Sequence, residues 1–176
     1  MTLLIVAGMP GAGKEELLNV ARSMGYGFVR MGDVVRKYYA LSSSESRGIS
    51  VGEFASEERK LFGADVWAAR SVEEVEGDLF LIDGCRSMDE VRSFSRVLGS
   101  TEIVAVHAPR SERFSRLVSR NREDAPKNEE EFDARDQREL DWGIGSVIAL
   151  SEHMIINDSD LETFRSRASE LLEKIG

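Results

Sequence analysis

The chain reads Gly8-Met9-Pro10-Gly11-Ala12-Gly13-Lys14 directly after the apolar run Leu3–Ala7 and before the helix-prone stretch Glu15–Met24. A glycine-rich turn between a strand and a helix lets successive backbone N–H groups surround a phosphate chain. The helix N-terminus adds positive potential, and Lys14 neutralises the terminal phosphates. We therefore predict a nucleotide-binding loop over these residues. A plain glycine turn would explain the glycines but not the lysine.

The residue after this loop departs from the usual pattern. Phosphate-binding loops normally carry Ser or Thr there to hold Mg²⁺, and this chain has Glu15. A carboxylate can hold the metal directly or through water. Without a metal, the same carboxylate repels the phosphates. We expect Mg²⁺ with ATP as the cofactor pair and Glu15 as a candidate metal ligand, and the sequence leaves catalytic competence open.

Length and charge exclude several classes of protein. The 176 residues suit one compact domain with a sizeable core, which we predict over residues 1–176. The net charge of −9 argues against a nucleic-acid binder, because a phosphate backbone requires a basic face. No apolar run reaches the length of a bilayer span, and the single cysteine, Cys85, suits a reducing interior. We expect a cytoplasmic protein with no nucleic-acid or membrane partner.

Short apolar runs alternate with helix-like sequence along the chain. The predicted strands are Leu3–Ala7, Gly27–Arg30, Leu79–Ile82, Glu102–His107 and Met154–Ile156. The predicted helices are Gly13–Met24, Asp33–Leu41, Val51–Phe62, Asp65–Glu76, Met88–Leu98, Ser111–Arg120, Asn128–Leu150 and Ser159–Ile175. Asn128 with Glu131, and Ser159 with Glu162, fit helix starts. Uniformly apolar strands followed by helices predict a three-layer α/β/α domain with a five-stranded parallel sheet.

An acidic residue ends the apolar strand Leu79–Ile82. Asp83 follows it directly, and Arg86 comes three residues later. Ligands of open parallel sheets bind at the carboxyl ends of the strands. Beside a phosphate loop, Asp83 can orient Mg²⁺ or its water, and Arg86 can hold an acceptor phosphate. The alternative is that Asp83 only caps the next helix.

A second acid–arginine pair follows the second strand, in Met31-Gly32-Asp33-Val34-Val35-Arg36. Asp33 can accept a proton from an attacking hydroxyl. Arg36 lies one turn later on the same helix face. The pair also fits a plain surface ion pair.

Arginines are dense in the third quarter of this acidic chain. The cluster consists of Arg110, Arg113, Arg116, Arg120 and Arg122, followed by Arg135 and Arg138. Planar guanidiniums offset the charge that spreads over a moving phosphoryl group. The alternative is a solvated helix face paired with neighbouring acids. Farther on, Asn157 follows the last strand, where it either shapes a base pocket or forms a turn.

Taken together and in this order, these residues resemble the small P-loop kinases over nearly the whole chain. Residues 32–36 resemble the adenylate kinase motif that contacts the acceptor nucleotide, and residues 83–86 resemble that family's Asp-Gly-x-x-Arg element, shortened by one residue. The C-terminal half is similar to dephospho-CoA kinase in Ala108-Pro109, Arg116-Leu117, Arg120, Ile156-Asn157-Asp158 and Leu161-Glu162. The best overall match is to an archaeal group of P-loop proteins related to both families. Three stretches carry it: residues 31–36, 82–87 and 135–140.

The resemblance implies roles for individual residues. Arg116 and Arg120 resemble paired arginines near the adenine and the phosphates, and Arg86 is expected at the acceptor phosphate. Arg122 and Arg135 resemble arginines that flank a lid, here shortened to about residues 121–128. Arg138 lies in the same matched stretch as Arg135, and these three arginines are the expected lid residues. The acceptor-side region, about residues 37–65, follows neither kinase family closely.

These features give three hypotheses. The first is an ATP-dependent phosphotransferase acting on a nucleotide-like acceptor, of the nucleoside monophosphate or dephospho-CoA type. Its catalytic residues are Lys14, Asp33 and Arg120, and its metal ligands are Glu15 and Asp83. The nucleotide is bound by the loop from Gly8 to Glu15 together with Arg116, Arg120 and Asn157. The acceptor is bound by Asp33, Arg36, Asp83 and Arg86. The second is a nucleotide sensor without catalysis, which Glu15 favours. The third is a slow NTP hydrolase.

Overall fold

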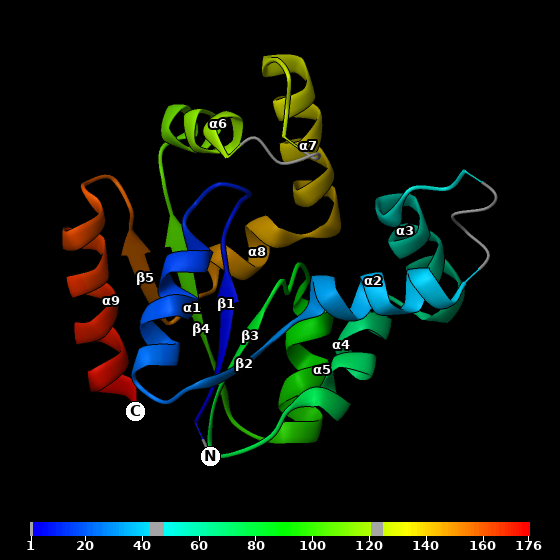
Figure 1. Cartoon of the computed structure of the whole chain (residues 1–176). Coiled ribbons are helices and arrows are strands. Elements are labelled where there is room, and N and C mark those ends of the chain that lie inside the picture. Colours follow the sequence, from blue (N-terminus) through cyan, green and yellow to red (C-terminus); the bar gives the residue numbers. More distant parts are fainter. Residues whose placement is uncertain (1, 43–47, 121–124) are drawn as a thin grey trace.

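The computed structural model describes residues 2–42, 48–120 and 125–176. Five strands form one sheet in the order β2-β3-β1-β4-β5 (Figure 1). Their bounds are β1 Thr2–Ala7, β2 Gly27–Arg30, β3 Leu79–Asp83, β4 Thr101–His107 and β5 His153–Ile156. All four neighbouring pairs are parallel, which confirms the predicted three-layer α/β class.

Helices cover both faces of the sheet (Figure 1). One layer holds α1 Lys14–Ser23 and α9 Leu161–Ile175. The other face is covered by α2 Met31–Leu41, α4 Val66–Ser71 with the following 3₁₀ turn Val72–Glu74, α5 Met88–Leu98 and α8 Ile144–Ala149. Farther out lie α3 Val51–Phe62, α6 Arg110–Ser119 and α7 Glu129–Trp142.

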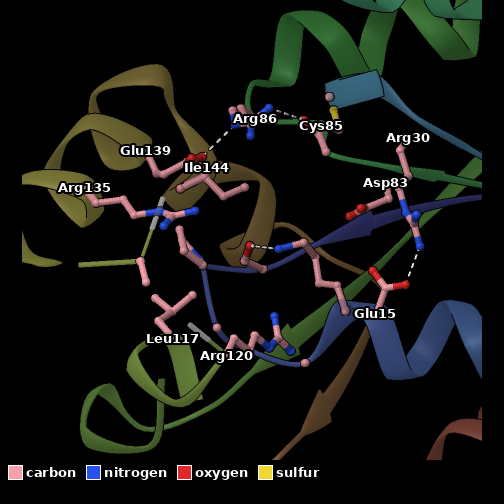
Figure 2. A pocket seen from close by; sticks show the side chains of 18 of the residues that line it. Glu15, Arg30, Asp83, Cys85, Arg86, Leu117, Arg120, Arg135, Glu139 and Ile144 are labelled. Carbon is pink, nitrogen blue, oxygen red and sulfur yellow. Dashed lines mark hydrogen bonds and ion pairs between the residues drawn. The ribbon is translucent and has the colours of Figure 1, made fainter. Parts of the chain in front are cut away.

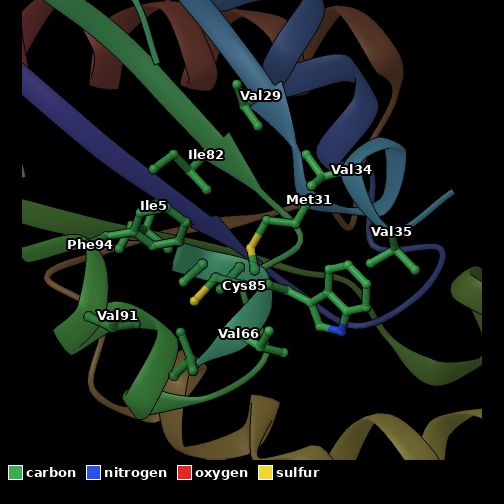
Figure 3. Packing of buried hydrophobic residues seen from close by; sticks show 14 of the residues in the cluster. Ile5, Val29, Met31, Val34, Val35, Val66, Ile82, Cys85, Val91 and Phe94 are labelled. Carbon is green, nitrogen blue, oxygen red and sulfur yellow. The ribbon is translucent and has the colours of Figure 1, made fainter. Parts of the chain in front are cut away.

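Alternate residues of the central strand β1 enter two separate apolar clusters. Leu3 and Ile5 pack on the side of α4 and α5, whereas Leu4 and Val6 pack on the side of α1 and α9. Figure 3 shows the first cluster, in which Ile5 and Ile82 of the sheet meet Phe94 of α5. A strand that is buried on both faces has no side in contact with solvent, which explains its uninterrupted apolar sequence.

The predicted helix Asn128–Leu150 is wrong as a single element. It divides at Gly143, whose φ of 104° places it in the left-handed region. Left-handed backbone ends a helix, and glycine adopts it without steric cost. The change of direction lets α8 bury Ile144 and Val147. Likewise, the predicted helix Asp65–Glu76 resolves into α4 and the short 3₁₀ turn.

One of the two predicted helix starts is confirmed. The Asn128 side chain accepts a hydrogen bond from the Glu131 amide at 2.8 Å, as expected. The predicted start at Ser159 is wrong, because Asp160 caps α9 by accepting from the Thr163 amide at 2.9 Å. An ionised carboxylate at the helix N-terminus also gains from the helix dipole, which a serine hydroxyl does not. Among the described residues, no helix is long and apolar enough to cross a membrane.

Candidate functional site

A cavity of about 340 Å³ lies at the carboxyl ends of the central strands (Figure 2). Eleven of the predicted site residues line it: Gly8, Pro10, Gly11, Gly13, Lys14, Glu15, Arg36, Asp83, Arg86, Arg120 and Arg135. The sheet brings them together because β1, β2 and β3 run parallel and end at the same edge. Binding at this edge is the general rule for open parallel sheets.

The glycine-rich loop is compact because its neighbours press against it. Gly11 and Gly13 have left-handed φ values of 81° and 107°. A Cβ at Gly11 would lie 2.7 Å from the Arg113 carbonyl oxygen, and one at Gly13 would lie 2.2 Å from Asn157 Nδ2. Both the backbone conformation and the space at these positions therefore require glycine.

Hydrogen-bond donors of this loop remain available. The Ala12 amide donates to the Met9 carbonyl at 3.1 Å, which closes the turn. Within the described residues, the amides of Gly11, Gly13 and Lys14 donate no hydrogen bond. Donors beside a cavity at a helix N-terminus form the arrangement that binds phosphate.

Lys14 sits at the first position of α1 with its ammonium group turned back to the loop. Its Nζ donates to the Gly8 carbonyl at 2.7 Å (Figure 2). Burial lowers the pKa of Lys14 from its usual 10.5, against the charges of Asp83 and Glu139, which raise it. Within the described residues the Gly8 carbonyl is the one hydrogen-bond acceptor of this ammonium group, so a polyanion in the adjacent cavity would stabilise it further.

Two side chains from outside the loop hold its backbone in place. The Arg113 guanidinium donates to the Pro10 carbonyl at 3.0 Å and forms a bidentate pair with Asp136 of α7. The buried Asn157 amide donates to the Ala12 carbonyl at 2.8 Å. Arg113 and Asn157 thus act on the loop as structural supports.

Asp83 stands at the end of β3, opposite Val6 of β1 and Arg30 of β2 in the strand register. Its Oδ1 is buried and, among the described residues, has no hydrogen-bond partner. Burial raises the pKa of Asp83, while Lys14, Arg86 and Arg30 lower it. An unpartnered buried carboxylate oxygen beside a phosphate loop is the kind of donor that Mg²⁺ or a metal-bound water takes.

Glu15 is engaged by a residue from the neighbouring strand. Arg30, at the end of β2, forms an ion pair with it (Figure 2). Among the described residues, no group of three or more His, Cys, Asp or Glu side chains could hold a metal ion. Mg²⁺ needs few protein ligands, because it keeps several waters and binds substrate phosphates. Asp83 therefore fits a magnesium site, with Glu15 able to join once it leaves Arg30.

Arg86 is held between the loop after β3 and helix α7. Its Nε donates to Glu139 at 2.7 Å, and one terminal nitrogen donates to the Gly84 carbonyl at 3.0 Å (Figure 2). Burial lowers the pKa of Arg86, but the charge and hydrogen bond of Glu139 outweigh it and raise the value. Arg86 is thereby fixed at the cavity wall.

Comparison with known proteins agrees with this geometry. A family model described as an AAA domain matches residues 7–133. The UPF0200 protein of Thermoplasma volcanium is 45% identical over 171 residues, which cover 97% of this chain and 96% of the relative. The UPF0200 protein of Hyperthermus butylicus is 41% identical and covers 98% of this chain and 94% of the relative. The chain belongs to the UPF0200 family. The predicted membership of a kinase-related archaeal group of P-loop proteins is thereby confirmed.

Solved structures of low sequence identity share the fold of this UPF0200 protein. Shikimate kinase from Bacteroides thetaiotaomicron superposes with a TM-score of 0.66 at 19% identity and covers 98% of both chains. A gluconokinase from Sinorhizobium meliloti gives a TM-score of 0.62 at 16% identity, with 98% of this chain and 92% of that chain covered. The predicted P-loop kinase fold is confirmed by these likenesses.

Other predicted site residues of this UPF0200 protein lie around the cavity or apart from it. Arg120 lines the cavity and, within the described residues, makes no ion pair. Arg116 lies behind the loop and donates to the Asn157 carbonyl at 3.2 Å. Arg138 lines a neighbouring cavity, and Arg122 falls outside the described residues. Met9 and Ala12 shape the loop without lining the cavity.

Asp33 is on the exposed side of α2 and forms an ion pair with Arg36. Arg36 lines the cavity, whereas Asp33 does not. The role of Asp33 as a base therefore stays a prediction.

Sequence reasoning missed two charged cavity residues, Arg30 and Glu139. Arg30 ends a predicted strand, so the rule that singled out Asp83 could have found it too. Nothing in the sequence around Glu139 indicates a role in the site, because its partner Arg86 lies 53 residues away in the sequence.

Proposed function

We propose that this UPF0200 protein is an ATP-dependent phosphotransferase that moves the γ-phosphate of ATP to a nucleotide-like small molecule. One observation carries the proposal. Within the described residues, loop amides that donate no hydrogen bond and the half-buried ammonium group of Lys14 lie beside Asp83, whose buried Oδ1 has no hydrogen-bond partner there. Polyphosphate binding satisfies the amides and Lys14, and a metal ion satisfies Asp83.

Lys14 and the loop amides bind the donor phosphates. In the free protein, Lys14 donates a hydrogen bond to the neutral Gly8 carbonyl. When ATP binds, Lys14 donates to an anionic phosphate oxygen instead. Charge-assisted hydrogen bonds are about twice as strong as neutral ones. Lys14 then stabilises the negative charge of the transferring group.

Asp83 and Glu15 are the residues that would hold Mg²⁺. Bound Mg²⁺ neutralises phosphate charge during transfer. Glu15 must first leave Arg30, and the freed guanidinium then remains at the cavity wall. We propose that this exchange lets a carboxylate replace the usual Ser or Thr.

Arg36 and Arg86 bind the acceptor, and Asp33 orients an acceptor hydroxyl or takes its proton. Both arginines line the same cavity as the loop. If the acceptor group is a phosphate, no base is needed and Asp33 only positions Arg36 through their ion pair. Arg120 and Arg135 approach the phosphates and exclude water when the cavity closes around both substrates.

The fold relatives support the reaction class. Two of the superposed structures are described as a shikimate kinase and a gluconokinase. The nucleoside monophosphate or dephospho-CoA type of acceptor is proposed from the sequence motifs at residues 32–36 and 83–86.

The function is tested by melting the protein against ATP, GTP, AMP, CMP and dephospho-CoA, each with and without Mg²⁺. Ligands that bind only the folded state raise the melting temperature. We expect Mg²⁺–ATP and one acceptor to do so, and the pair to release ADP together. ADP release that does not depend on any acceptor would contradict a phosphotransferase and favour the hydrolase.

A second candidate function is a nucleotide sensor without catalysis, which the Glu15–Arg30 ion pair favours. If Arg30 retains Glu15 when ATP binds, the metal lacks one ligand and transfer is slow. Glu15→Ser restores the usual hydroxyl. A large gain of acceptor-dependent ADP release in Glu15→Ser supports the sensor, whereas a loss supports Glu15 as a working metal ligand.

A further inference from the structure

A second cavity of about 430 Å³ continues from the first. The two cavities share Arg86, Arg135 and Glu139 in their walls. The second one reaches Gly52, near the start of α3, on one side and Trp142, at the end of α7, on the other. A ligand that projects past Arg86 therefore enters a cavity lined by residues of α3 and α7, the helices whose places Figure 1 shows.

The walls of this second cavity are basic. Four cationic residues line it, namely Arg86, Lys127, Arg135 and Arg138, against two carboxylates, Glu131 and Glu139. The whole chain has a net charge of −9, so the excess of positive charge in this cavity is local and opposite in sign to the charge of the protein as a whole. A concave surface with one sign of charge attracts ligands of the other sign.

Two of these cations are uncommitted. Glu139 neutralises Arg86, and Glu131 accepts the backbone amide of Lys127 at 2.9 Å. Within the described residues, the side chains of Lys127 and Arg138 form no ion pair with any carboxylate. Arginine is well suited to bind a tetrahedral oxyanion because its planar group donates two parallel hydrogen bonds.

Trp142 keeps Arg138 at the cavity wall. Its indole ring has the Cζ atoms of Arg59, Arg86 and Arg138 at 5.1, 5.3 and 5.9 Å from its centroid. Arg59 is neutralised by the buried Glu90 at 2.9 Å. The aromatic face attracts Arg138 without cancelling its charge, so the guanidinium is positioned and still able to bind an anion.

We propose that this second cavity is a phosphate subsite of the acceptor, in which Arg138 and Lys127 bind a phosphoryl group distant from the one that reacts. The proposal rests on the function proposed above and narrows it to acceptors with a second phosphate group. The reacting end lies near Arg36 and Arg86, and the distal phosphate lies between α3 and α7.

The test uses pyrophosphate as the probe and Trp142 as the reporter, after the phosphate loop has been filled with Mg²⁺ and a non-hydrolysable ATP analogue. Trp67, the only other tryptophan, is buried in the core away from this cavity, and Trp142→Phe identifies the origin of the signal. We expect a saturable fluorescence change. Arg138→Gln weakens pyrophosphate binding about tenfold, the loss of one charge-assisted contact, and leaves the affinity for the ATP analogue unchanged.

Arg92→Gln is the matched control, because Arg92 is an exposed arginine on α5 that pairs with Asp89 one turn away on the same helix. The proposal is overturned if no saturable change occurs, or if Arg138→Gln binds pyrophosphate as tightly as Arg92→Gln. A parallel titration of Lys14→Met without the ATP analogue distinguishes a failure of the subsite proposal from a failure of the proposed phosphotransferase function. Binding that still depends on Arg138 there supports the subsite, even if the protein proves not to transfer phosphate.

Discussion

The proposed donor side and the proposed acceptor side of the cavity are built in different ways. On the donor side, the loop between β1 and α1 is held by buried groups that reach it from α6 and from the end of β5. On the proposed acceptor side, α2 carries the exposed pair Asp33–Arg36 within the helix and the pair Lys37–Glu74 to the 3₁₀ turn, while α3 is held by the buried pair Arg59–Glu90. The loop backbone is thus held by buried side chains, whereas the part of α2 that carries Arg36 is held by exposed ion pairs.

Exposed apolar side chains sharpen this contrast. Leu41, Leu61 and Phe62, at the ends of α2 and α3, are 81%, 73% and 62% exposed. The loop residues Gly11, Ala12 and Gly13 are buried. Side chains with few packing partners reorganise at low cost. The comparison therefore indicates that the phosphate loop is set in advance and that the acceptor side adjusts to what binds.

The largest effect is expected at Arg113. Arg113→Met leaves Asp136 charged and mostly buried without its partner, and leaves the Pro10 carbonyl without its donor. Breaking a buried ion pair from one side costs about 3–5 kcal/mol. We expect a loss of that size in the free energy of unfolding, measured by urea denaturation.

Arg110→Met is the control on the same helix, because Arg110 forms exposed ion pairs with Glu129 and Asp133. Its unfolding free energy should stay close to that of the wild type. Equal losses of unfolding free energy in both variants would show that Arg113 stabilises the protein no more than an arginine on an exposed helix surface does.

The next effect is expected at Asn157. Asn157→Ala leaves the Ala12 carbonyl buried and unpaired, which costs about 1–3 kcal/mol. Because the damage lies in the loop, the affinity for the ATP analogue should fall together with stability. Calorimetric titration measures the affinity and urea denaturation measures the stability. A stable variant with normal affinity would show that the loop needs no such support.

Sequence alone predicted the fold better than the site. Apolar runs located every strand of the sheet, because burial on both faces removes polar residues. The break at Gly143 was missed because a glycine inside a helical pattern is usually tolerated. Ser159 and Asp160 are adjacent residues that can both cap a helix, so only the structure decides between them.

The parts of the site that the sequence did not predict depend on pairs of residues that lie far apart in the sequence. The sequence placed Arg113, Arg116 and Arg120 in one arginine-dense cluster, but their partners differ. Arg113 pairs with Asp136 on another helix, whereas Arg120 faces the cavity. Spacing along one helix shows which residues share a face, and it contains no information about what a second helix brings to that face.

Alkaline pH provides a smaller test of the donor side. Burial lowers the pKa of Lys14 below 10.5, and a polyphosphate beside the ammonium raises it again. ATP binding therefore takes up a proton between these two values, and affinity falls as pH rises through that range. We expect the affinity for ATP to fall in titrations as the pH is raised toward 10.5, whereas Lys14→Arg, which stays charged, shows no such loss.

The smallest effect on stability is expected at Arg36. Its ion pair with Asp33 is exposed, and such pairs contribute about 0–1 kcal/mol. Arg36→Gln should melt like the wild type and still bind ATP, but require more acceptor for half-maximal ADP release. A loss of ATP binding instead would place Arg36 on the donor side and undo the contrast between the two sides.

Lys14→Met gives the most direct test, with the shift in melting temperature on adding Mg²⁺–ATP as the readout. A ligand at 100 times its dissociation constant stabilises the wild type by about 2.7 kcal/mol, which should appear as a clear upward shift. The variant should melt normally when free and show no shift. A wild-type shift in Lys14→Met would contradict the assignment of the loop from Gly8 to Lys14 as the phosphate-binding site.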